Sequence, residues 1–382
     1  MTLNSFQVML KLHMKSGTLS RKNFIKLLGL GASTIGFTPF LANLYQTSFP
    51  DYERLGRVCI IGMVEIKSAP SEDSQTLGVI YEDAVIPWYR DAIAKVPNMN
   101  YFNQRWVETQ DGYVYAAYIQ PVKNILNQPI TELQTMSMGE GMWVEVTVPY
   151  ADMSLVTNPS SNSWVKARLD ESLPLRVYYG QVYFIDQIKT DDAGNTFYRC
   201  NPNYYGGVDM FWVPAEAVHP IASNELAPIN PEIENKKIVI DVTRQTLSCF
   251  EGDTEVYYCR VSTGAKYDMY GNAVDKWSTP LGSFLVSRKF ISLQMSGGTT
   301  GAPYDLPGIG WASLFATGGV AIHATVWHNE FGTPKSHGCV NTLPEDAKWI
   351  FRWSLPQIPY DPGTVDISLT GDNSTTVQVI ET

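Results

Sequence analysis

The sequence predicts a mainly β protein with two or three domains. Its 382 residues exceed what one small domain needs. Hydrophobic residues make up 44% of the chain and charged residues 17%, so the chain can bury sizeable cores. The 29 Gly and 23 Pro residues, with 12% aromatic residues, favour short strands joined by turns over long helices.

Charge is unevenly distributed along the chain. Residues 1–50 contain cations but no Asp or Glu, so all 38 acidic residues follow them, and the whole chain has a net charge of −10. An acidic body of this kind lacks the basic surface that nucleic acids require. The composition therefore excludes a nucleic-acid-binding protein.

Residues 1–48 are expected to be an export signal. Five cations precede Leu27–Asn43, which is apolar and uncharged, and this order is typical of a secretory signal. Ser20–Lys26 (SRKNFIK) resembles the twin-arginine signal, with Lys22 in place of the second arginine. An amphipathic helix of the fold is one alternative. An uncleaved anchor is another, although the glycines and Pro39 make a poor spanning helix. We therefore expect an exported protein of the cell envelope that meets a membrane only during export or through such an anchor.

Residues 52–125 are expected to form a first small barrel. β-rich runs separated by turn residues recur in this segment, at Arg57–Lys67, Leu77–Tyr81 and Tyr113–Ile119. The pattern that includes Trp106, Asp111–Val114 and Ile119–Pro121 resembles bacterial SH3-like domains.

A second barrel of the same kind is expected at residues 140–222. Val177–Lys189, Phe197–Arg199 and Phe211–Val213 repeat the closing order of the first segment. The repeat rests on few positions, and irregular β structure is the alternative for both segments. The Pro-spaced residues 223–235 read as a linker.

From residue 236 to 370 the sequence predicts a further β-rich domain. Strand runs at Lys237–Val242, Gln245–Phe250 and Val256–Arg260 open it, and the last two flank a hairpin turn. Asp346–Trp353 is the one persuasive helix, and Val365–Leu369 reads as a final strand. Residues 371–382 are expected to be a polar tail.

A cluster of chemically active residues lies in this last domain. Three of the five histidines, His323, His328 and His337, fall within fifteen residues, and Cys339 follows two positions after the last. A uniform scatter rarely produces such crowding. The cluster therefore indicates a site.

The sequence around Cys339 favours a reactive thiol. Thr342 and Glu345 have the spacing of a capping box, with Pro344 in the first turn, so a helix terminus is expected just beyond the cysteine. Such a terminus and a nearby imidazole favour a thiolate. Gly338 permits the close backbone approach that an oxyanion site needs.

The cluster has two other interpretations. Cys339 could be a small buried hydrophobic residue beside loop histidines. The three histidines and Cys339 could also bind zinc, but His-x4-His and His-x-Cys are not typical structural zinc spacings. No metal and no cofactor is expected.

The motif itself resembles a known family. Ser336–Asn341 (SHGCVN), preceded by His323, resembles the YkuD-type L,D-transpeptidase motif of a histidine, a spacer and [S/T]-H-G-C-x-N. Further landmarks of that family match Gln245, Ser262–Gly264 and Thr279–Phe284. The resemblance covers about residues 236–370.

This resemblance implies a β-rich catalytic domain that acts on peptidoglycan stem peptides. Cys339 would attack the carbonyl on the L-centre of a diamino acid in a stem tetrapeptide and release the terminal D-alanine. A neighbouring stem amine would then accept the acyl group and form a cross-link, whereas water as acceptor would make the protein a carboxypeptidase or peptidase. A catalytically inactive wall-binding protein is a further alternative. The SH3-like modules would bind wall material, and a monomer is expected.

The resemblance also implies roles for individual residues. His323 would be the general acid and base, oriented by the backbone carbonyl of Ala324, and the N–H groups at Gly338 and Cys339 would hold the oxyanion. The residues expected to shape the loop are Ser336, His337 and Asn341. His328 lies outside the motif and is interpreted as a loop residue with a minor chance of touching substrate. Tyr304 and Trp311 could line the cleft, with core packing as the alternative for Trp311.

The remaining cysteines leave the number of disulfides open. Cys59, Cys200, Cys249 and Cys259 are compatible with zero, one or two bridges in an exported protein. Cys249 and Cys259 flank one hairpin turn, but their positions look offset in register, so no bridge is predicted between them.

Overall fold

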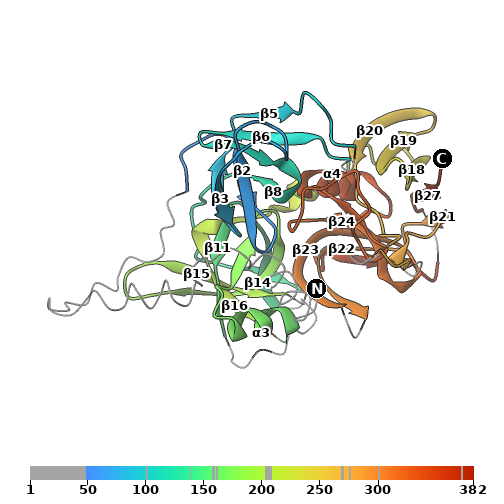
Figure 1. Ribbon diagram of the computed structural model, residues 1–382. Helices are drawn as coiled ribbons and strands as arrows, with labels where there is room; N and C mark the ends of the chain where they lie inside the picture. The colour runs from blue at the N-terminus through green and yellow to red at the C-terminus, as the bar shows by residue number, and fades with distance from the viewer. Residues whose placement is uncertain are drawn as a thin grey trace. The chain divides into compact units, whose positions relative to one another are not determined.

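The computed structural model describes residues 49–99, 102–137, 139–156, 160, 162–202, 209–267, 271–274, 277–299, 302–370 and 373–382. These residues form a mainly β structure, as predicted (Figure 1). The expected export signal at residues 1–48 lies outside the described residues. Residues 49–295 and 306–382 form one compact unit, which contains the three segments below except for the ends of two strands within residues 296–305.

The first segment consists of short strands around one small core. Its three-stranded sheet has the order β4 (Val85–Pro87), β1 (Leu55–Val58), β8 (Ile119–Val122). Its five-stranded sheet has the order β3 (Thr76–Tyr81), β2 (Met63–Lys67), β7 (Gly112–Tyr115), β6 (Arg105–Thr109), β5 (Arg90–Ile93). The 3₁₀ turn η1 (Ala116–Tyr118) joins β7 to β8. Val58, Val64, Trp88, Val107 and Val114 are among its buried residues.

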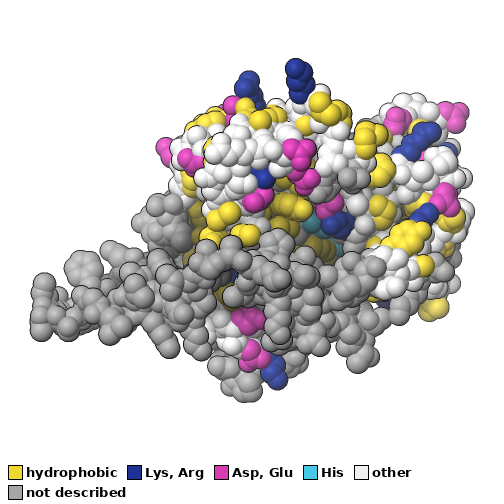
Figure 2. Space-filling view, viewed as in Figure 1, with side chains coloured by type: hydrophobic (Ala, Val, Ile, Leu, Met, Phe, Trp, Pro, Cys, Tyr) yellow, Lys and Arg dark blue, Asp and Glu magenta, His cyan; other side chains and the backbone are white. Residues whose placement is uncertain are grey.

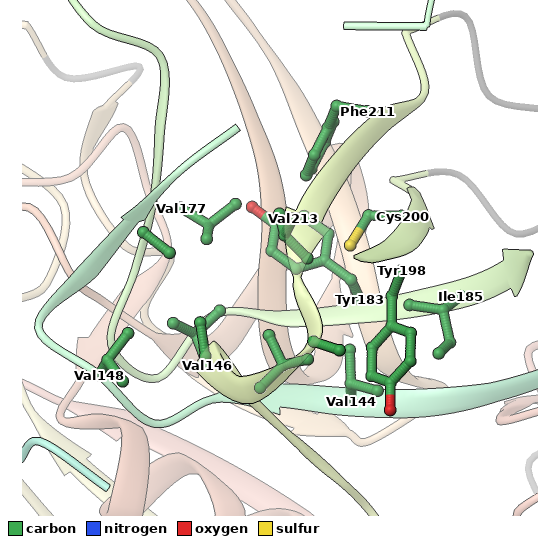
Figure 3. Close-up of a cluster of buried hydrophobic side chains, with 14 of the residues drawn as sticks. Val144, Val146, Val148, Val177, Tyr183, Ile185, Tyr198, Cys200, Phe211 and Val213 are labelled. Atoms are coloured by element: carbon green, nitrogen blue, oxygen red, sulfur yellow. The ribbon is translucent and has the colours of Figure 1, made fainter. Parts of the chain in front are cut away.

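The second segment contains a larger sheet. The main path is β12 (Ser154–Leu155), β16 (Phe211–Pro214), β15 (Thr196–Asn201), β14 (Val182–Thr190), β10 (Gly139–Val146), β17 (Val218–Pro220), and β9 (Gln134–Met136) pairs with β10. A separate pair joins β11 (Tyr150–Asp152) to β13 (Arg176–Tyr178), and α3 spans Ser163–Asp170. Val144, Tyr183, Ile185, Tyr198 and Val213 lie in its core (Figure 3).

Both segments end with the same order of elements. In the first, η1 separates β7 from β8, and in the second the 3₁₀ turn η2 (Ala215–Ala217) separates β16 from β17. The assignment of either segment to SH3-like domains stays a prediction. The expected linker at residues 223–235 begins with the 3₁₀ turn η3 (Ser223–Leu226), whose Leu226 is buried.

The third segment has two five-stranded sheets. The first has the order β20 (Thr254–Arg260), β19 (Thr246–Glu251), β18 (Lys236–Asp241), β27 (Thr376–Ile380), β21 (Gly282–Leu285). The second has the order β25 (Val340–Thr342), β24 (Val320–Ala324), β23 (Ala302–Ala316), β22 (Arg288–Thr299), β26 (Thr364–Asp366). The 3₁₀ turn η5 (Thr317–Gly319) joins β23 to β24, and α4 spans Pro344–Trp353. One core joins both sheets and α4 through residues that include Ile238, Leu247, Ile322, Val340 and Ile350.

The carboxyl-terminal tail predicted from the sequence is wrong. Residues Thr376–Ile380 form β27, which pairs in parallel with β18, and Val377 and Val379 are buried. The predicted strand at Val365–Leu369 is shorter and earlier, at Thr364–Asp366. Polar residues alternate with apolar ones in β27, which is a strand pattern, but its partner lies more than a hundred residues earlier in the chain.

The second and third segments share a core. Trp143 and Phe184 from the second segment pack with Trp311 and Phe351 from the third. The Trp143 indole also donates a hydrogen bond to the carbonyl of Tyr360 at 3.1 Å. The apolar surfaces of the second and third segments are therefore buried against each other in one hydrophobic core.

A buried lysine closes the carboxyl end of α4. Lys289 on β22 is 1% exposed, and its Nζ donates to the carbonyl oxygens of Phe351 (2.5 Å), Ser354 (2.8 Å) and Pro356 (2.9 Å). The last carbonyls of a helix lack intrahelical partners. Lys289 supplies a partner for Phe351 at the end of α4 and for two carbonyls of the residues that follow, and so holds this end of α4 next to β22.

We expect Lys289→Met to lower the free energy of unfolding by about 3 kcal/mol, because three buried carbonyl oxygens lose their donor. Urea unfolding followed by tryptophan fluorescence measures this change. Lys166→Met, at an exposed position of α3, is the matched control and should stay within about 0.5 kcal/mol of the parent. Equal midpoints for the two variants would contradict the capping role.

Candidate active site

The register of β24 and β25 brings Cys339 and His323 to one face of a sheet. The two strands are parallel, with Ile322 opposite Val340 and His323 opposite Asn341. Side chains alternate along a strand. Ile322 and Val340 lie in the core between the sheets, so the odd-numbered residues face the other way. Cys339, which directly precedes β25, accordingly packs on a separate cluster that includes Ala321.

His323 is held in one tautomer. Its Nδ1 lies 2.9 Å from the carbonyl oxygen of Ala324, so Nδ1 carries the proton and Nε2 is bare. Burial lowers the pKa of His323 to about 4, although the same hydrogen bond acts in the opposite direction. The imidazole is therefore neutral near pH 7, and its Nε2 is available as a base. This hydrogen bond to Ala324 is the one that the family resemblance implies.

The thiol of Cys339 is not in the environment that the sequence suggested. Burial raises its pKa to about 11, against the effect of a hydrogen bond from the backbone of Ala321. Its Sγ also lies 3.8 Å from the carbonyl oxygen of Gly319. The resting pair is thus a neutral thiol and a neutral imidazole.

The predicted capping box is wrong. The cap residue of α4 is Leu343, which makes no side-chain cap, although Pro344 does begin the helix. Thr342 belongs to β25 instead, and its hydroxyl donates to the carbonyl of His323 at 3.2 Å. Pairing with β24 takes the hydroxyl that the helix would have used.

A loop around Thr263 holds the chain next to Cys339. The N–H groups of Lys335 and Ser336 donate to the carbonyl of Thr263 at 2.9 and 3.1 Å. Gln245 fixes Thr263 in turn, since its side chain accepts from the N–H of Thr263 at 2.8 Å and donates to its hydroxyl at 2.7 Å. Ser262 and Asn341 exchange backbone hydrogen bonds of 3.0 and 2.9 Å. Gln245, Ser262 and Thr263, which are far from Cys339 in sequence, therefore form one hydrogen-bonded group next to the cysteine loop, here called the cradle.

Thr279 links this cradle to the residue before the cysteine. Its hydroxyl accepts from the N–H of Gly264 at 2.9 Å and donates to the carbonyl of Gly338 at 2.8 Å. A Cβ at Gly264 would lie 1.9 Å from the carbonyl oxygen of Trp277, so only glycine fits. Gly338 has a φ of 122°, which favours glycine.

Ser336 closes the turn that carries Cys339. Its hydroxyl accepts from the N–H of Gly338 at 3.1 Å and donates to the carbonyl of Cys339 at 2.5 Å. The N–H of Gly338, expected to hold the oxyanion, is thus engaged by Ser336 in this structure. His337 is exposed, with its ring 4.4 Å from that of Trp277.

Sequence reasoning undervalued His328. This residue lies in a loop, as expected, but it is buried, and its Nε2 lies 3.0 Å from the Asn341 carboxamide. Its Nδ1 accepts from the N–H of Glu330 at 3.2 Å. The close spacing of the three histidines in the sequence is the pattern that could have indicated a role for His328.

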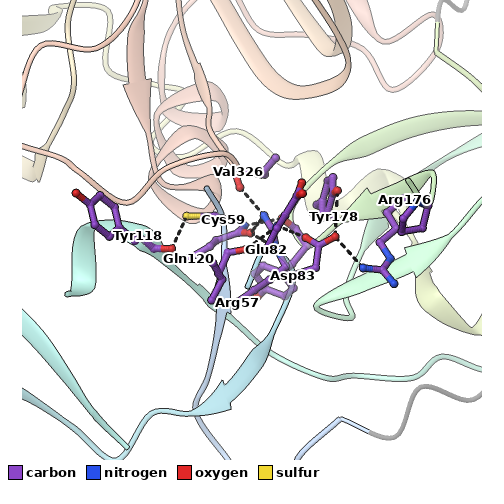
Figure 4. A network of polar contacts seen from close by, with 12 residues as sticks. Arg57, Cys59, Glu82, Asp83, Tyr118, Gln120, Arg176, Tyr178 and Val326 are labelled. Atoms are coloured by element: carbon purple, nitrogen blue, oxygen red, sulfur yellow. Dashed lines mark hydrogen bonds and ion pairs between the residues drawn. The ribbon is translucent and has the colours of Figure 1, made fainter. Parts of the chain in front are cut away.

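The first segment holds the loop that contains His328. Arg57 donates to the carbonyl of Val326 at 2.6 Å (Figure 4). Asn329 donates through its backbone to the carbonyl of Ala117 and through its side chain to that of Ala116, both at 3.0 Å. No motif in the sequence indicated these contacts.

Arg57 belongs to a buried polar network. Its guanidinium contacts Asp83 at 2.9 Å and Gln120 at 2.7 Å, and lies 4.1 Å from the ring of Tyr178. Arg176 of the second segment reaches the other oxygen of Asp83 at 2.8 Å (Figure 4). All three segments thus meet at this network.

One of the expected cleft residues, Trp311, lies in a hydrophobic core. Trp311 is fully buried in the core shared with the second segment, 5.5 Å from the ring of Phe351, which fits the packing alternative. The side chain of Tyr304 lies outside the described part of the structure.

No group of three or more His, Cys, Asp or Glu side chains in the described ranges is arranged to hold a metal ion.

Cys59, Cys200, Cys249 and Cys259 are buried free thiols. Cys249 lies opposite Tyr257 and Cys259 opposite Leu247, so the predicted register offset is confirmed. Among the helices that are described, none is long and apolar enough to cross a membrane.

Comparison with known proteins identifies the third segment. The YkuD family model, described as the L,D-transpeptidase catalytic domain, matches residues 235–379. These residues form a YkuD L,D-transpeptidase catalytic domain, as the motif predicted.

Individual relatives match only part of the chain. L,D-transpeptidase 2 of Mycobacterium tuberculosis is 24% identical over 155 residues, which cover 37% of this chain and 38% of the relative. The chain thus spans less than half of that curated relative. Among solved structures, a mutant Enterococcus faecium L,D-transpeptidase is 24% identical over 39% of this chain and 51% of its own, with a TM-score of 0.29. An L,D-transpeptidase from Mycobacterium smegmatis is 16% identical over 68% of this chain and 100% of its own, with a TM-score of 0.30.

We expect Thr279→Val to slow alkylation of Cys339 by iodoacetamide and to lower the free energy of unfolding by about 2 kcal/mol. The variant leaves the N–H of Gly264 and the carbonyl of Gly338 without their shared hydroxyl. Thr279→Ser keeps the hydroxyl and is the matched control. If the Val and Ser variants react and unfold alike, Thr279 does not support the cysteine turn.

The raised pKa of the Cys339 thiol predicts a steep pH profile. Only the thiolate reacts with iodoacetamide, and a pKa of about 11 leaves about one thiol in 10,000 ionised at pH 7. The alkylation rate of the native protein should therefore rise about tenfold per pH unit from pH 7 to 9. Stopped aliquots analysed by peptide mass spectrometry measure it, because the other four cysteines are buried. A plateau below pH 8 would show a stabilised thiolate and contradict the prediction.

Proposed function

We propose that this protein is an exported peptidoglycan L,D-transpeptidase that works through an acyl-enzyme on Cys339. The observation that carries the proposal is the placement of Cys339 and His323 on one sheet face, with Nδ1 of His323 tied to Ala324. This arrangement leaves Nε2 free to act as a base on the sheet face that carries the thiol. The YkuD match of the same residues supports the choice of reaction.

The neutral resting pair defines the order of proton movements. Nε2 of His323 takes the thiol proton as Sγ of Cys339 attacks the carbonyl of the L-centre in the donor stem. The tetrahedral intermediate collapses to a thioester, and the imidazolium gives its proton to the departing amine of D-alanine. In the second half, Nε2 removes a proton from the acceptor amine, which attacks the thioester, and the proton then returns to the thiolate.

Hydrolysis remains a second candidate reaction. The acyl-enzyme is common to both, and water in place of the acceptor amine gives an L,D-carboxypeptidase. A non-catalytic wall-binding protein is the third candidate, and it requires an unreactive Cys339.

We further propose that the first two segments are SH3-like modules that bind wall material. The outward face of β2 and β3 supports this for the first segment, because Met63, Leu77, Val79 and Tyr81 are exposed there. Figure 2 shows apolar side chains on this part of the surface. Residues 1–48 would direct the protein to the cell envelope.

Intact-mass spectrometry with a carbapenem tests the acyl-enzyme. A carbapenem carries a strained amide that Cys339 should open, so we expect one adduct on the parent and none on Cys339→Ala. Cys200→Ala, which removes a buried thiol in the second segment, is the matched control and should keep the adduct. If Cys339 resists both the carbapenem and iodoacetamide, the catalytic proposal fails.

Incubation with purified tetrapeptide muropeptides separates transfer from hydrolysis. We expect D-alanine release together with a cross-linked dimer in the parent, and neither product with His323→Ala, which lacks the base. Chromatography with mass detection resolves the products. Release of D-alanine with tripeptide alone would identify a carboxypeptidase.

A further inference from the structure

The hydrogen bonds of His328 determine where its proton sits. A backbone N–H can only donate, and that of Glu330 points at Nδ1 of His328 at 3.2 Å. Nδ1 therefore has no proton. Burial, with Lys335 and His323, lowers the pKa of His328 to about 3, so the ring is neutral near pH 7. The proton of a neutral ring without Nδ1–H lies on Nε2.

This tautomer fixes the orientation of the Asn341 amide. Nε2–H of His328 needs an acceptor, and the carboxamide of Asn341 is 3.0 Å away. With Nδ2 of Asn341 facing the ring, two donors would oppose each other, and Oδ1 of Asn341 would be buried without a partner among the described residues. A half-turn of the amide about Cβ–Cγ removes the opposition of donors, because Oδ1 then accepts from His328, and it leaves Nδ2 as the buried atom without a partner among the described residues.

The same half-turn redirects the amide nitrogen. Nδ2 takes the position that Oδ1 would otherwise occupy. Asn341 lies opposite His323 and two residues after Cys339, so its side chain belongs to the sheet face that carries both. The N–H groups of Nδ2 then lie in a buried position on that face.

We propose that His328 is a positioning residue for the transpeptidase site, which holds the side chain of Asn341 in one orientation on the sheet face that carries Cys339 and His323. The role in the reaction rests on the proposed function, whereas the tautomer and the amide orientation do not.

The first segment keeps His328 in place. The residues on either side of the His328 backbone are anchored, with Val326 bonded to Arg57 and Asn329 bonded to Ala116 and Ala117. These contacts hold the loop backbone that carries His328 next to Asn341. The active-site amide is therefore oriented through contacts that reach outside the catalytic domain.

Nitrogen NMR of the full-length protein tests the tautomer directly. Long-range ¹H–¹⁵N correlation of the imidazole rings identifies the protonated nitrogen of each histidine, and His328→Gln assigns the His328 signals. We expect Nε2–H for His328 and Nδ1–H for His323. A proton on Nδ1 of His328 would overturn the proposal whether or not the protein is an enzyme.

Rates of acylation by a carbapenem test the effect on the site. We expect His328→Leu to lower the maximal acylation rate about tenfold, the loss of one hydrogen bond, with little change in the half-saturating concentration. His328→Gln retains an amide donor toward Oδ1 and should restore most of the rate. Because His328 acts through Asn341, His328→Leu should add little to Asn341→Leu.

Each outcome bears on one proposal. Independent, additive losses in the double variant, or a His328→Gln rate as low as that of His328→Leu, would overturn the positioning role. No acylation of the parent would defeat the proposed function, and the NMR result would then decide the amide orientation alone. Circular dichroism melts of each variant show that a lost rate does not reflect unfolding.

Discussion

The parallel pairing of β24 with β25 is the contact on which the site depends. It aligns His323 with Asn341 and puts Cys339 on the same face. A slip of one residue would turn Cys339 into the core and expose Val340. Ile322 and Val340, packed between the two sheets, and the backbone exchange between Ser262 and Asn341 resist that slip. Burial of Ile322 and Val340 on one face of the sheet thus fixes the positions of His323 and Cys339 on the other face.

Burial also sets the charge states of Cys339 and His323. Desolvation disfavours both the thiolate of Cys339 and the imidazolium of His323, so the two groups rest in their neutral forms. In the proposed reaction, proton transfer would therefore accompany the attack of the thiol instead of preceding it.

The segments before the catalytic domain contribute to its interior. Arg57 and Asp83 form a buried ion pair whose members also contact the second segment and the loop after His323. Removing one partner would leave an uncompensated buried charge, which costs several kcal/mol. The first two segments therefore support the geometry of the site in addition to any binding that they perform.

Local patterns in the sequence determined the mainly β class, the helix at α4, the offset of Cys249 and Cys259, and the residues around Cys339, because strand alternation, turn residues and a contiguous motif are local properties. The landmarks at Gln245, Ser262–Gly264 and Thr279 were also visible, but not the cradle that they form. Only the tertiary structure decided the strand at Thr376–Ile380, the strand contact of Thr342, the core position of Trp311 and the hydrogen bonds of His328. Each depends on partners far away in the chain. The raised pKa of Cys339 likewise comes from burial, which no local pattern specifies.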